Sequence, residues 1–452
     1  MNEKTKNEED PKMKNTKRLI AIVLAVVMCL TLVACGGGKA ATAAPGSMKE
    51  IKVCIWDNNQ KPGLQEIADK WSEKSGIKVT FDVVDWNNYW TLLEAGASGG
   101  ELPDVFWMHS NTVQMYMEND LLLKLDDYVA ADATTDMANY YEGITELYTR
   151  KDNGGLYALP KDHDTIALLY NKAIFDQYGV AYPTDDWTWE DMYEAAKTIT
   201  EASNGDVYGL ALNTSNNQDG YYNVVYSYGA QIITDDHKGT TIGSAEGKQA
   251  MEMVRKLLTT AIPQAVVAES GTDSLFVSGK VAMITQGSWM IRYFYDAENH
   301  ADYAWAMLPY ADVNGNGTCE KTERWSCYNG LGWAAKADVA DPQAAYDLIA
   351  YFCSEEGQKL QAEKGITLAG MYGCSDAFST AFEGMDVSAF IKVEEEGSLF
   401  FRPYTRNTVV WEDALMKAGC FLDAWQDYDN AAAMATACDN AQRIIEEAIA
   451  AE

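Results

Sequence analysis

Strand and helix patterns alternate along the chain after its first fifty residues, and this alternation most strongly constrains the fold. The short apolar-rich runs at 52–56, 77–84 and 104–107 predict strands. Between them, residues 63–75 and 89–97 place apolar side chains at the spacing of a helix with one buried face. Strands that alternate with helices at this pitch predict an α/β fold with a mostly parallel sheet.

The chain beyond residue 187 continues the pattern with longer helices. Thr188 is the expected cap of a helix that runs to about residue 202, and residues 244–258 predict another. Asp341 followed by Pro342 predicts a capped helix start. The region 409–450 looks helical almost throughout. With 452 residues, the chain is too long for a single core, so we expect about two domains.

The N-terminus predicts export. A basic cluster precedes a short apolar run that ends in Leu-Val-Ala before Cys35, as in a bacterial lipobox. We therefore interpret residues 1–34 as a lipoprotein signal peptide, Cys35 as the lipidated residue and 35–48 as a flexible tether. A plain signal peptide with a cysteine at the cleavage site is the alternative, and Met13 could be the true start. We expect the protein on the extracytoplasmic face of the cell membrane, touching it through the lipid anchor alone.

Charge and composition limit the ligand classes. The chain carries 35 Lys and Arg against 67 Asp and Glu, a formal net charge of −32. Such a surface repels nucleic acid and anionic lipid, so we expect no nucleic-acid partner and a neutral or cationic ligand. The 13 Trp and 26 Tyr outnumber the 12 Phe, a bias that suits a sugar cleft, although such aromatics also fill cores.

The cysteines do not predict a disulfide framework. Of nine, Cys29 and Cys35 belong to the export segment, and seven remain, an odd number that leaves at least one thiol free. Cys319 and Cys327 are near enough in sequence to pair. A zinc site is not expected, because the chain has no CxxC and four histidines, and we expect no required cofactor.

One loop matches the calcium-binding pattern D-x-[DN]-x-[DN]-G-x5-E. Its oxygen ligands would suit calcium, with a glycine at the sharp turn. The flanks do not predict a helix pair, so an ordinary Asn/Gly hairpin loop is the alternative, and the sequence leaves both open. The candidate ligands of this structural site are Asp312, Asn314, Asn316, Thr318 and Glu323.

Five segments share a familiar order. They are the strand–helix–strand of 51–81, the segment 101–129, 156–200 with its Tyr-Asn-Lys and Trp-Thr-Trp-Glu, 277–290 with G-K-x-A-M and G-x-W, and 329–360. In this order they resemble the maltose-binding-protein-like extracellular solute-binding proteins of bacterial ABC sugar importers. The resemblance covers nearly the whole chain after the tether.

The resemblance implies a periplasmic-binding-protein-like fold of type II. Two discontinuous α/β lobes would be joined by a hinge, with 49–162 plus 307–365 in the first and 163–306 plus 366–452 in the second. The ligand would lie in the cleft between them, and lobe closure would present it to the permease subunits of the transporter. We expect a monomer without enzymatic activity that binds a sugar or oligosaccharide.

The resemblance also implies ligand contacts, position by position. Trp289 falls on the family's stacking tryptophan, and Asp164 falls where relatives place a carboxylate that binds sugar hydroxyls. Asn58 and Asn59 stand where a charged pair is found in the maltose-binding relative, which leaves the ligand's identity open. His109 either faces the cleft or caps its strand. The other implied contacts are Trp107, Ser110, Asn111, Tyr221, Tyr222, Trp325 and Trp411.

Two alternatives remain open at this point. A secreted glycoside hydrolase would use a pair of carboxylates and the same aromatic residues. The same fold could instead bind a peptide or a polyamine, which the acidic surface permits. An enzyme would turn over a glycoside, whereas a receptor binds and releases it unchanged.

Overall fold

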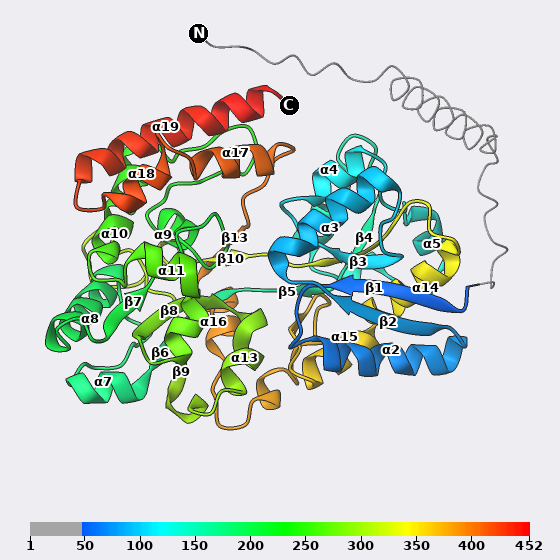
Figure 1. Ribbon diagram of the computed structural model, residues 1–452, viewed down its shortest axis with the longest axis horizontal. Helices are drawn as coiled ribbons and strands as arrows, with labels where there is room; N and C mark the ends of the chain where they lie inside the picture. Colours follow the sequence, from blue (N-terminus) through cyan, green and yellow to red (C-terminus); the bar gives the residue numbers. More distant parts are fainter. Residues whose placement is uncertain (1–47) are drawn as a thin grey trace, which may run out of the picture. The chain divides into compact units, whose positions relative to one another are not determined.

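The computed structural model describes residues 48–452, which belong to one structural unit beginning at Pro45. The predicted signal peptide, Cys35 and the tether up to residue 47 lie outside the described residues. Two separate sheets with helices packed around them organise this unit, which confirms the α/β prediction (Figure 1). None of the helices between residues 48 and 452 is long and apolar enough to cross a membrane.

The first sheet has five strands in the order β2-β1-β3-β11-β4. β1 pairs in parallel with β2 and β3, and β11 runs antiparallel to β3 and β4. The strands are β1 (Glu50–Ile55), β2 (Lys78–Val83), β3 (Val105–Met108), β4 (Ala158–Pro160) and β11 (Gly332–Ala335). The helices of this first lobe are α2 (Lys61–Ser75), α3 (Trp86–Gly99), α4 (Val113–Glu118), α5 (Asp126–Ala131), α6 (Glu142–Leu147), α14 (Pro342–Cys353) and α15 (Glu355–Glu363).

Local signals explain where α2 and α3 begin and end. Gly76 adopts a φ of 73°, a left-handed conformation that ends α2 at little steric cost. The Asp85 side chain caps α3 by accepting a hydrogen bond from the Asn88 backbone N–H. Because β1 lies between β2 and β3, right-handed crossovers place α2 and α3 on opposite faces of the sheet.

The second sheet has four strands in the order β7-β8-β6-β9. The inner strand β6 is buried along its whole length. Its alternate residues face two different cores, Ile166 one and Ala167 the other. The strands are β6 (Ile166–Asn171), β7 (Tyr208–Ala211), β8 (Val281–Gly287) and β9 (Tyr303–Met307). The helices of this second lobe are α7 (Lys172–Tyr178), α8 (Trp189–Ala202), α9 (Tyr222–Ser227), α10 (Ala245–Leu258), α11 (Gln264–Ser270), α12 (Thr272–Val277), α13 (Ile291–Tyr295), α16 (Ala389–Glu396), α17 (Thr408–Leu415), α18 (Phe421–Gln426) and α19 (Ala431–Ala450).

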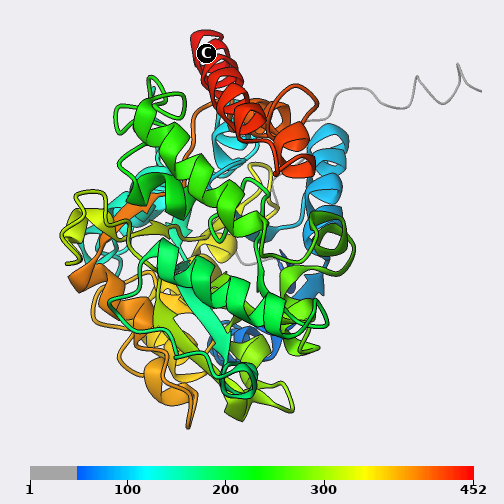
Figure 2. The ribbon, with the colours of Figure 1, turned by 90° about the vertical axis from the view of Figure 1, so that its left-hand side faces the viewer.

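The helices of the second lobe largely follow their sequence signals. Thr188 caps α8 in a capping box with Asp191. The region 409–450 is not one helix, because Gly419 adopts a φ of 88° between α17 and α18, and a further turn precedes α19. α19 packs along α10, and Figure 2 shows the two helices side by side.

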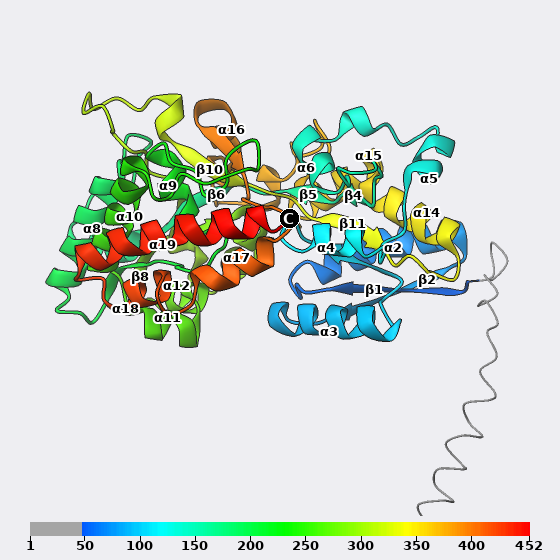
Figure 3. The same cartoon turned by 90° about the horizontal axis from the view of Figure 1, so that it is seen from above.

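Three stretches of the described chain connect the two lobes: one runs from β4 to β6 through β5 (Asp162–His163), one from β9 to β11 through β10 (Trp325–Tyr328), and one from α15 to α16 through β12 (Leu368–Ala369). β5 pairs with β12, and β10 pairs with β13 (Ser398–Phe401). Figure 3 shows the C-terminus at the junction of the lobes, where Arg406 bonds both Glu118 of α4 and the backbone oxygen of Glu452. The first core includes Ala369, Cys374 and Tyr404, which lie beyond the predicted boundary at residue 365, so the lobe bounds stay a prediction.

All seven cysteines in the described part of the chain are free thiols. The sequence required at least one free thiol, and Cys319 and Cys327 do not pair. Cys319 is half-buried, and the other six cysteines are buried.

Candidate ligand-binding site

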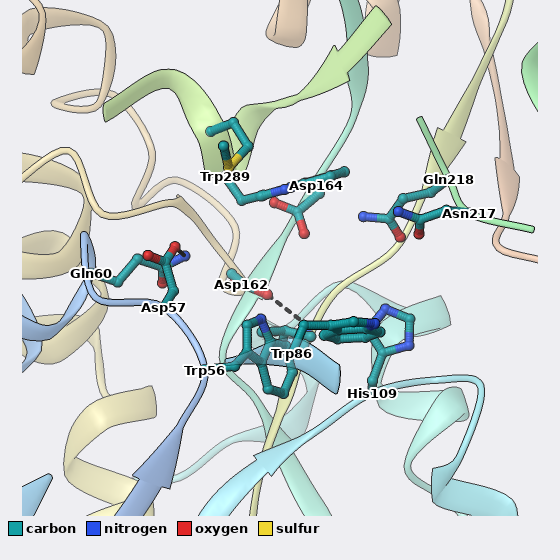
Figure 4. A pocket seen from close by; sticks show the side chains of 12 residues that line it. Trp56, Asp57, Gln60, Trp86, His109, Asp162, Asp164, Asn217, Gln218 and Trp289 are labelled. Carbon is teal, nitrogen blue, oxygen red and sulfur yellow. Dashed lines mark hydrogen bonds between the residues drawn. The ribbon is translucent and has the colours of Figure 1, made fainter. Parts of the chain in front are cut away.

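A cavity of about 340 Å³ lies where the two lobes and their connecting strands meet (Figure 4). Its wall combines residues that follow β1 and β3 with residues of the crossing strands and of the second lobe. Loops at the carboxyl ends of parallel strands are the usual place for ligands in α/β folds. The lining residues are Trp56, Asp57, Gln60, Trp86, His109, Asp162, Asp164, Asn217, Gln218, Trp289, Met290 and Leu331.

The turn between β1 and α2 presents Trp56, Asp57 and Gln60. Asp57 holds the turn together, because its Oδ1 accepts the Asn59 backbone N–H at 2.7 Å and its Oδ2 accepts the Gln60 Nε2 at 3.1 Å. Burial raises the pKa of Asp57 despite these hydrogen bonds. The turn therefore offers a carboxyl group of fixed orientation to the cavity.

Aromatic rings form one wall of the cavity. The rings of Trp56 and Trp86 meet edge to face at 5.1 Å between centroids, and Trp86 meets His109 at 5.5 Å. Trp56 is fixed from behind by Trp107, whose ring lies 4.8 Å away. Trp86 opens α3 and is 40% exposed, so part of its apolar face is available to a ligand. Flat apolar surfaces of this kind suit the C–H faces of a sugar ring.

His109 lines the cavity as a neutral ring. Its Nε2 lies 3.2 Å from Asn329 Nδ2, and its Nδ1 lies 2.8 Å from Asn111 Oδ1 and 3.3 Å from the Asn111 backbone nitrogen. Burial, and then the charge of Arg402, lower the pKa of His109 to about 3. His109 therefore stays uncharged at neutral pH and acts as a polar aromatic surface.

Two carboxyl groups project from the strand that crosses between the lobes. Asp162 is occupied by the fold: it accepts the Leu331 backbone N–H at 2.7 Å and pairs with the buried Lys161. Asp164 accepts a hydrogen bond from the Ser288 hydroxyl at 3.0 Å, and Figure 4 shows its carboxyl group directed into the cavity. Burial and the nearby Asp162 raise the pKa of Asp164 well above its usual value.

Trp289 lies in the short 3-10 turn that follows β8. A Cβ atom on Gly287 would come within 1.7 Å of the indole ring, so this ring lies directly against the backbone of the glycine. The absence of a side chain at Gly287 is what allows this placement. Trp289 thus faces the cavity from the side opposite Trp56 and Trp86 (Figure 4).

The loop after β7 contributes amide groups. Gln218 is buried, and its Oε1 has no hydrogen-bond partner among the described residues. Buried acceptors without a partner cost free energy and are uncommon, so a hydroxyl-bearing ligand would satisfy this group. Asn217 lines the cavity beside Gln218.

The structure brings together part of the set that the sequence implied. Asp164 and Trp289 line the cavity, and His109 faces it. Asn58 and Asn59 are exposed in the adjoining turn, outside the lining, while their neighbours Asp57 and Gln60 belong to it.

Four of the implied residues lie outside the cavity lining. Three belong to the first lobe, and the fourth lies in a connecting strand. Trp107 is fully buried in β3 and packs against Trp333 at 5.8 Å. Ser110 is also buried, and the side chain of Asn111 contacts the ring of His109 through its Oδ1. Trp325 packs against Phe400 in the connecting strands, and its Nε1 donates to the Thr322 backbone oxygen at 2.7 Å.

The remaining three are buried in the core of the second lobe. Tyr221 packs against Phe421 at 5.5 Å, and Tyr222 donates its hydroxyl hydrogen to Glu412 at 3.3 Å. Trp411 donates from Nε1 to Thr405 at 3.2 Å. These rings hold the C-terminal helices against the lobe.

Several lining residues were not among those implied by the sequence. Trp56 and Asp57 directly follow β1, and Trp86 is the first residue of α3. The signal for the first two is their position directly after the strand, immediately before the predicted contact Asn58. The amides of Asn217 and Gln218 had no signal of their own in the sequence.

The loop at 312–323 folds back on its own side chains. Asp312 accepts the Gly317 backbone N–H at 3.1 Å, Asn314 that of Asn316 at 2.9 Å, and Asn316 that of Thr318 at 2.7 Å. Glu323 is buried and accepts from Asn314 at 3.0 Å. Between residues 48 and 452, no group of three or more His, Cys, Asp or Glu side chains is arranged to hold a metal ion.

The protein has known relatives in sequence and in structure. A galactooligosaccharide-binding protein of Bacillus subtilis is 22% identical over 367 residues, 78% of this chain and 80% of that protein. A maltooligosaccharide ABC transporter solute-binding lipoprotein of Streptococcus pneumoniae is 25% identical over 366 residues, 78% of this chain and 79% of its own.

Among solved structures, an ABC substrate-binding protein of Listeria monocytogenes in complex with cycloalternan superposes with a TM-score of 0.77. It is 22% identical, and the match covers 89% of this chain and 99% of that one, which establishes the shared fold. The family model of bacterial extracellular solute-binding proteins matches residues 57–359. The chain therefore belongs to the family of bacterial extracellular solute-binding proteins.

Proposed function

We propose that this protein captures a sugar or oligosaccharide in the cavity between its lobes and delivers it to an ABC importer. One observation carries the proposal: the cavity places apolar aromatic faces on two sides of fixed hydrogen-bonding groups. Trp56 and Trp86 lie on one side and Trp289 on the other, with Asp164 between them (Figure 4). Sugars need this combination, because their C–H faces are apolar while their hydroxyls accept and donate in fixed directions.

The charges around the cavity favour an uncharged ligand. None of the described residues that line it is a lysine or an arginine, and His109 is neutral. The names of the relatives, which bind galactooligosaccharides and maltooligosaccharides, support a sugar over the alternatives of a peptide or a polyamine.

Capture would proceed through lobe closure about the connecting strands. The cavity draws its walls from both lobes, so a change in their relative orientation would open or close it. We assign the lobes to 49–162 plus 307–365 and to 163–306 plus 366–452. The closed form would present both lobes to the permease subunits.

The binding role requires no covalent chemistry. Asp162 is held by Lys161 and by the Leu331 backbone, which favours a structural carboxylate over a catalytic one. We propose a monomer without enzymatic activity, tethered to the extracytoplasmic face of the membrane through a lipid on Cys35. Recovery of the unchanged sugar after incubation tests this against the glycoside hydrolase alternative.

We also propose that the loop at 312–323 binds calcium in a structural role. The backbone N–H groups of the loop already orient the oxygens of Asp312, Asn314 and Asn316. Oxygen ligands at these spacings, with Thr318 and Glu323, suit calcium. The loop contributes no residue to the cavity lining, so the calcium proposal is independent of the sugar proposal.

Isothermal calorimetry on a chain that begins at Pro45 tests the sugar proposal. The panel contains mono- to tetrasaccharides of glucose, galactose and mannose in α and β linkages, with a dipeptide and spermidine as alternatives. We expect one sugar series to bind with micromolar or lower Kd. Trp289→Ala should raise that Kd about 10- to 100-fold, the loss expected for a buried aromatic contact.

Trp325→Ala provides the matched control, because Trp325 is also a partly buried tryptophan but lies outside the cavity. It should leave the Kd within about twofold, with circular dichroism used to check that both variants fold. Tight binding of spermidine or the dipeptide without any sugar would replace the sugar proposal. Cleavage of the bound sugar would replace the receptor by an enzyme.

A further inference from the structure

A second cavity of about 630 Å³ borders the first within the second lobe. The two cavities share Asn217, Trp289 and Met290 as lining residues. The second cavity continues between α11 and the C-terminal helix α18, away from the first lobe. Trp289 therefore forms part of the wall of both cavities, and the space available to a ligand does not end at its ring.

The second cavity contains fixed hydrogen-bonding groups. Asn213 donates from Nδ2 to both carboxylate oxygens of Asp219, at 3.2 and 3.0 Å. Gln286 donates from Nε2 to Asp273 at 2.7 Å. Burial is the main cause that raises the pKa of both carboxyl groups, and Asp273 adds to the effect at Asp219. Both carboxyl groups are thus held in place and poorly solvated.

Apolar groups complete the lining. Met416, Leu422 and Trp425 come from the C-terminal region, and Val267 comes from α11. Trp425 is buried, and its Nε1 has no hydrogen-bond partner among the described residues. A cavity that joins apolar surface to a few fixed polar groups has the composition of a ligand site, and its volume falls in the range of such sites.

The charge pattern is the same in both cavities. Their described lining residues include five carboxyl groups and no lysine or arginine. The buried Lys161, outside the lining, pairs with Asp162, and its charge also acts on Asp57 and Asp164. An anionic sugar would therefore be buried in a poorly solvated space whose described lining offers it no cation. The five are Asp57, Asp162, Asp164, Asp219 and Asp273.

We infer that the second cavity is a further sugar subsite, so that the ligand is an uncharged oligosaccharide of at least two units extending past Trp289. This inference rests on the proposed function and specifies the ligand class of the same site. One unit lies in the first cavity against Trp56 and Trp86. The next lies between α11 and α18, where the carboxyl groups of Asp219 and Asp273 accept hydrogen bonds from its hydroxyls.

A pair of tryptophan substitutions on α11 tests the inference. Ala268 is exposed and lines the second cavity, so Ala268→Trp should fill it without disturbing the core. Ser270 is exposed on the same helix outside the lining, and Ser270→Trp is the matched control. Calorimetry compares the mono- to tetrasaccharides of the series that binds the parent protein.

We expect the parent protein to bind the longer sugar at least tenfold more tightly than the shorter one. Ala268→Trp should remove this gain and leave the Kd of the shorter sugar within about twofold, while Ser270→Trp keeps the gain. A gain that persists in Ala268→Trp, an equal loss at all lengths, or no gain in the parent protein would each overturn the inference. A panel in which no sugar binds at all would instead overturn the proposed function.

Charged oligomers test the ligand class. Oligogalacturonates and glucosamine oligomers of two to four units join the same panel. We expect the neutral series to bind more tightly than either. Tighter binding of oligogalacturonates would contradict the charge argument, and tighter binding of the glucosamine oligomers would show that the carboxyl groups select an amine.

Discussion

At the scale of single residues, Gly287 determines where the ring of Trp289 can lie. Its φ of −90° is open to any residue, so alanine fits the backbone but not the 1.7 Å space between the Cβ position and the indole. Gly287→Ala should therefore displace the ring and raise the sugar Kd about tenfold or more, while the protein remains folded. Calorimetry on the sugar that binds the parent protein measures the change.

Gly99→Ala is the matched control for this substitution. Gly99 lies at the end of α3 with no atom within 4 Å of the position that a methyl group would take, and alanine favours a helix over glycine. It should leave the Kd unchanged. A Gly287→Ala variant that binds sugar as tightly as the parent protein would show that the ring position does not matter for binding.

Asp219 should make the stability of the protein depend on pH. Burial raises its pKa from 3.8 to about 6, so the folded protein holds a proton over a range where the unfolded chain has lost it. The resulting stabilisation is present below pH 3.8 and is lost as the pH rises through 6, at most about 3 kcal/mol in the free energy of unfolding. Asp219→Asn should remove this contribution.

Urea unfolding between pH 4 and 7 measures the effect as the difference between Asp219→Asn and the parent protein. We expect the parent protein to lose more stability than the variant as the pH rises. The pKa of Glu412 is raised to about 7 mainly by burial, so Glu412 also makes the protein less stable as the pH rises. This contribution is the same in both proteins and cancels in the difference. Parallel pH profiles would contradict the prediction.

At the scale of elements, the loop at 312–323 makes its own prediction. Calcium that binds the folded loop should raise the midpoint of thermal unfolding, because a ligand of the native state stabilises it by mass action. Differential scanning calorimetry with millimolar calcium, and with magnesium as the control ion, measures the shift. Asp312→Asn should abolish the shift, since the amide keeps the hydrogen bond to Gly317 but loses the charge.

The elements themselves were predictable where periodicity and caps agree. The predicted ranges 63–75 and 244–258 match α2 and α10 within two residues, because each has one apolar face and a clear terminus. The C-terminal region was predicted as nearly continuous helix and contains three. Alanine-rich sequence favours helix throughout, and the break at Gly419 depends on a local left-handed turn.

The candidate site was less predictable, for a physical reason. At the end of a strand, side chains one or two residues apart differ between burial in the core and exposure to the cavity. Trp107, inside β3, is buried, whereas Trp56, directly after β1, lines the cavity. Tyr221 is enclosed by Phe421 and Trp425, which lie far from it along the chain. Local sequence carries no information about such distant packing.

At the scale of the whole molecule, a buried ion pair lies in the strand that joins the lobes. Lys161 and Asp162 are almost wholly inaccessible, and Lys161 also donates to Gln60 at 3.0 Å. Removing one partner leaves a buried charge without compensation, so Asp162→Asn should cost about 3–5 kcal/mol in the free energy of unfolding. Denaturant unfolding measures this cost.

The pair of the half-buried Arg150 and the exposed Asp152 is the control for this prediction. Asp152→Asn should cost less than about 1 kcal/mol, because solvent screens the pair. Replacing Lys161 by methionine in the Asp162→Asn background should recover part of the stability. A small cost for Asp162→Asn alone would mean that water or a neighbouring group compensates Lys161.

The accessibility of the thiols has a practical consequence for measuring these events. Six of the seven described cysteines are buried, so a thiol-reactive fluorophore added to the folded protein should attach mainly at Cys319. That residue lies inside the 312–323 loop and outside the lining of both cavities. A chain that begins at Pro45 would thus carry a single optical reporter without any engineering, and its emission would follow the state of the loop while calorimetry follows the sugar.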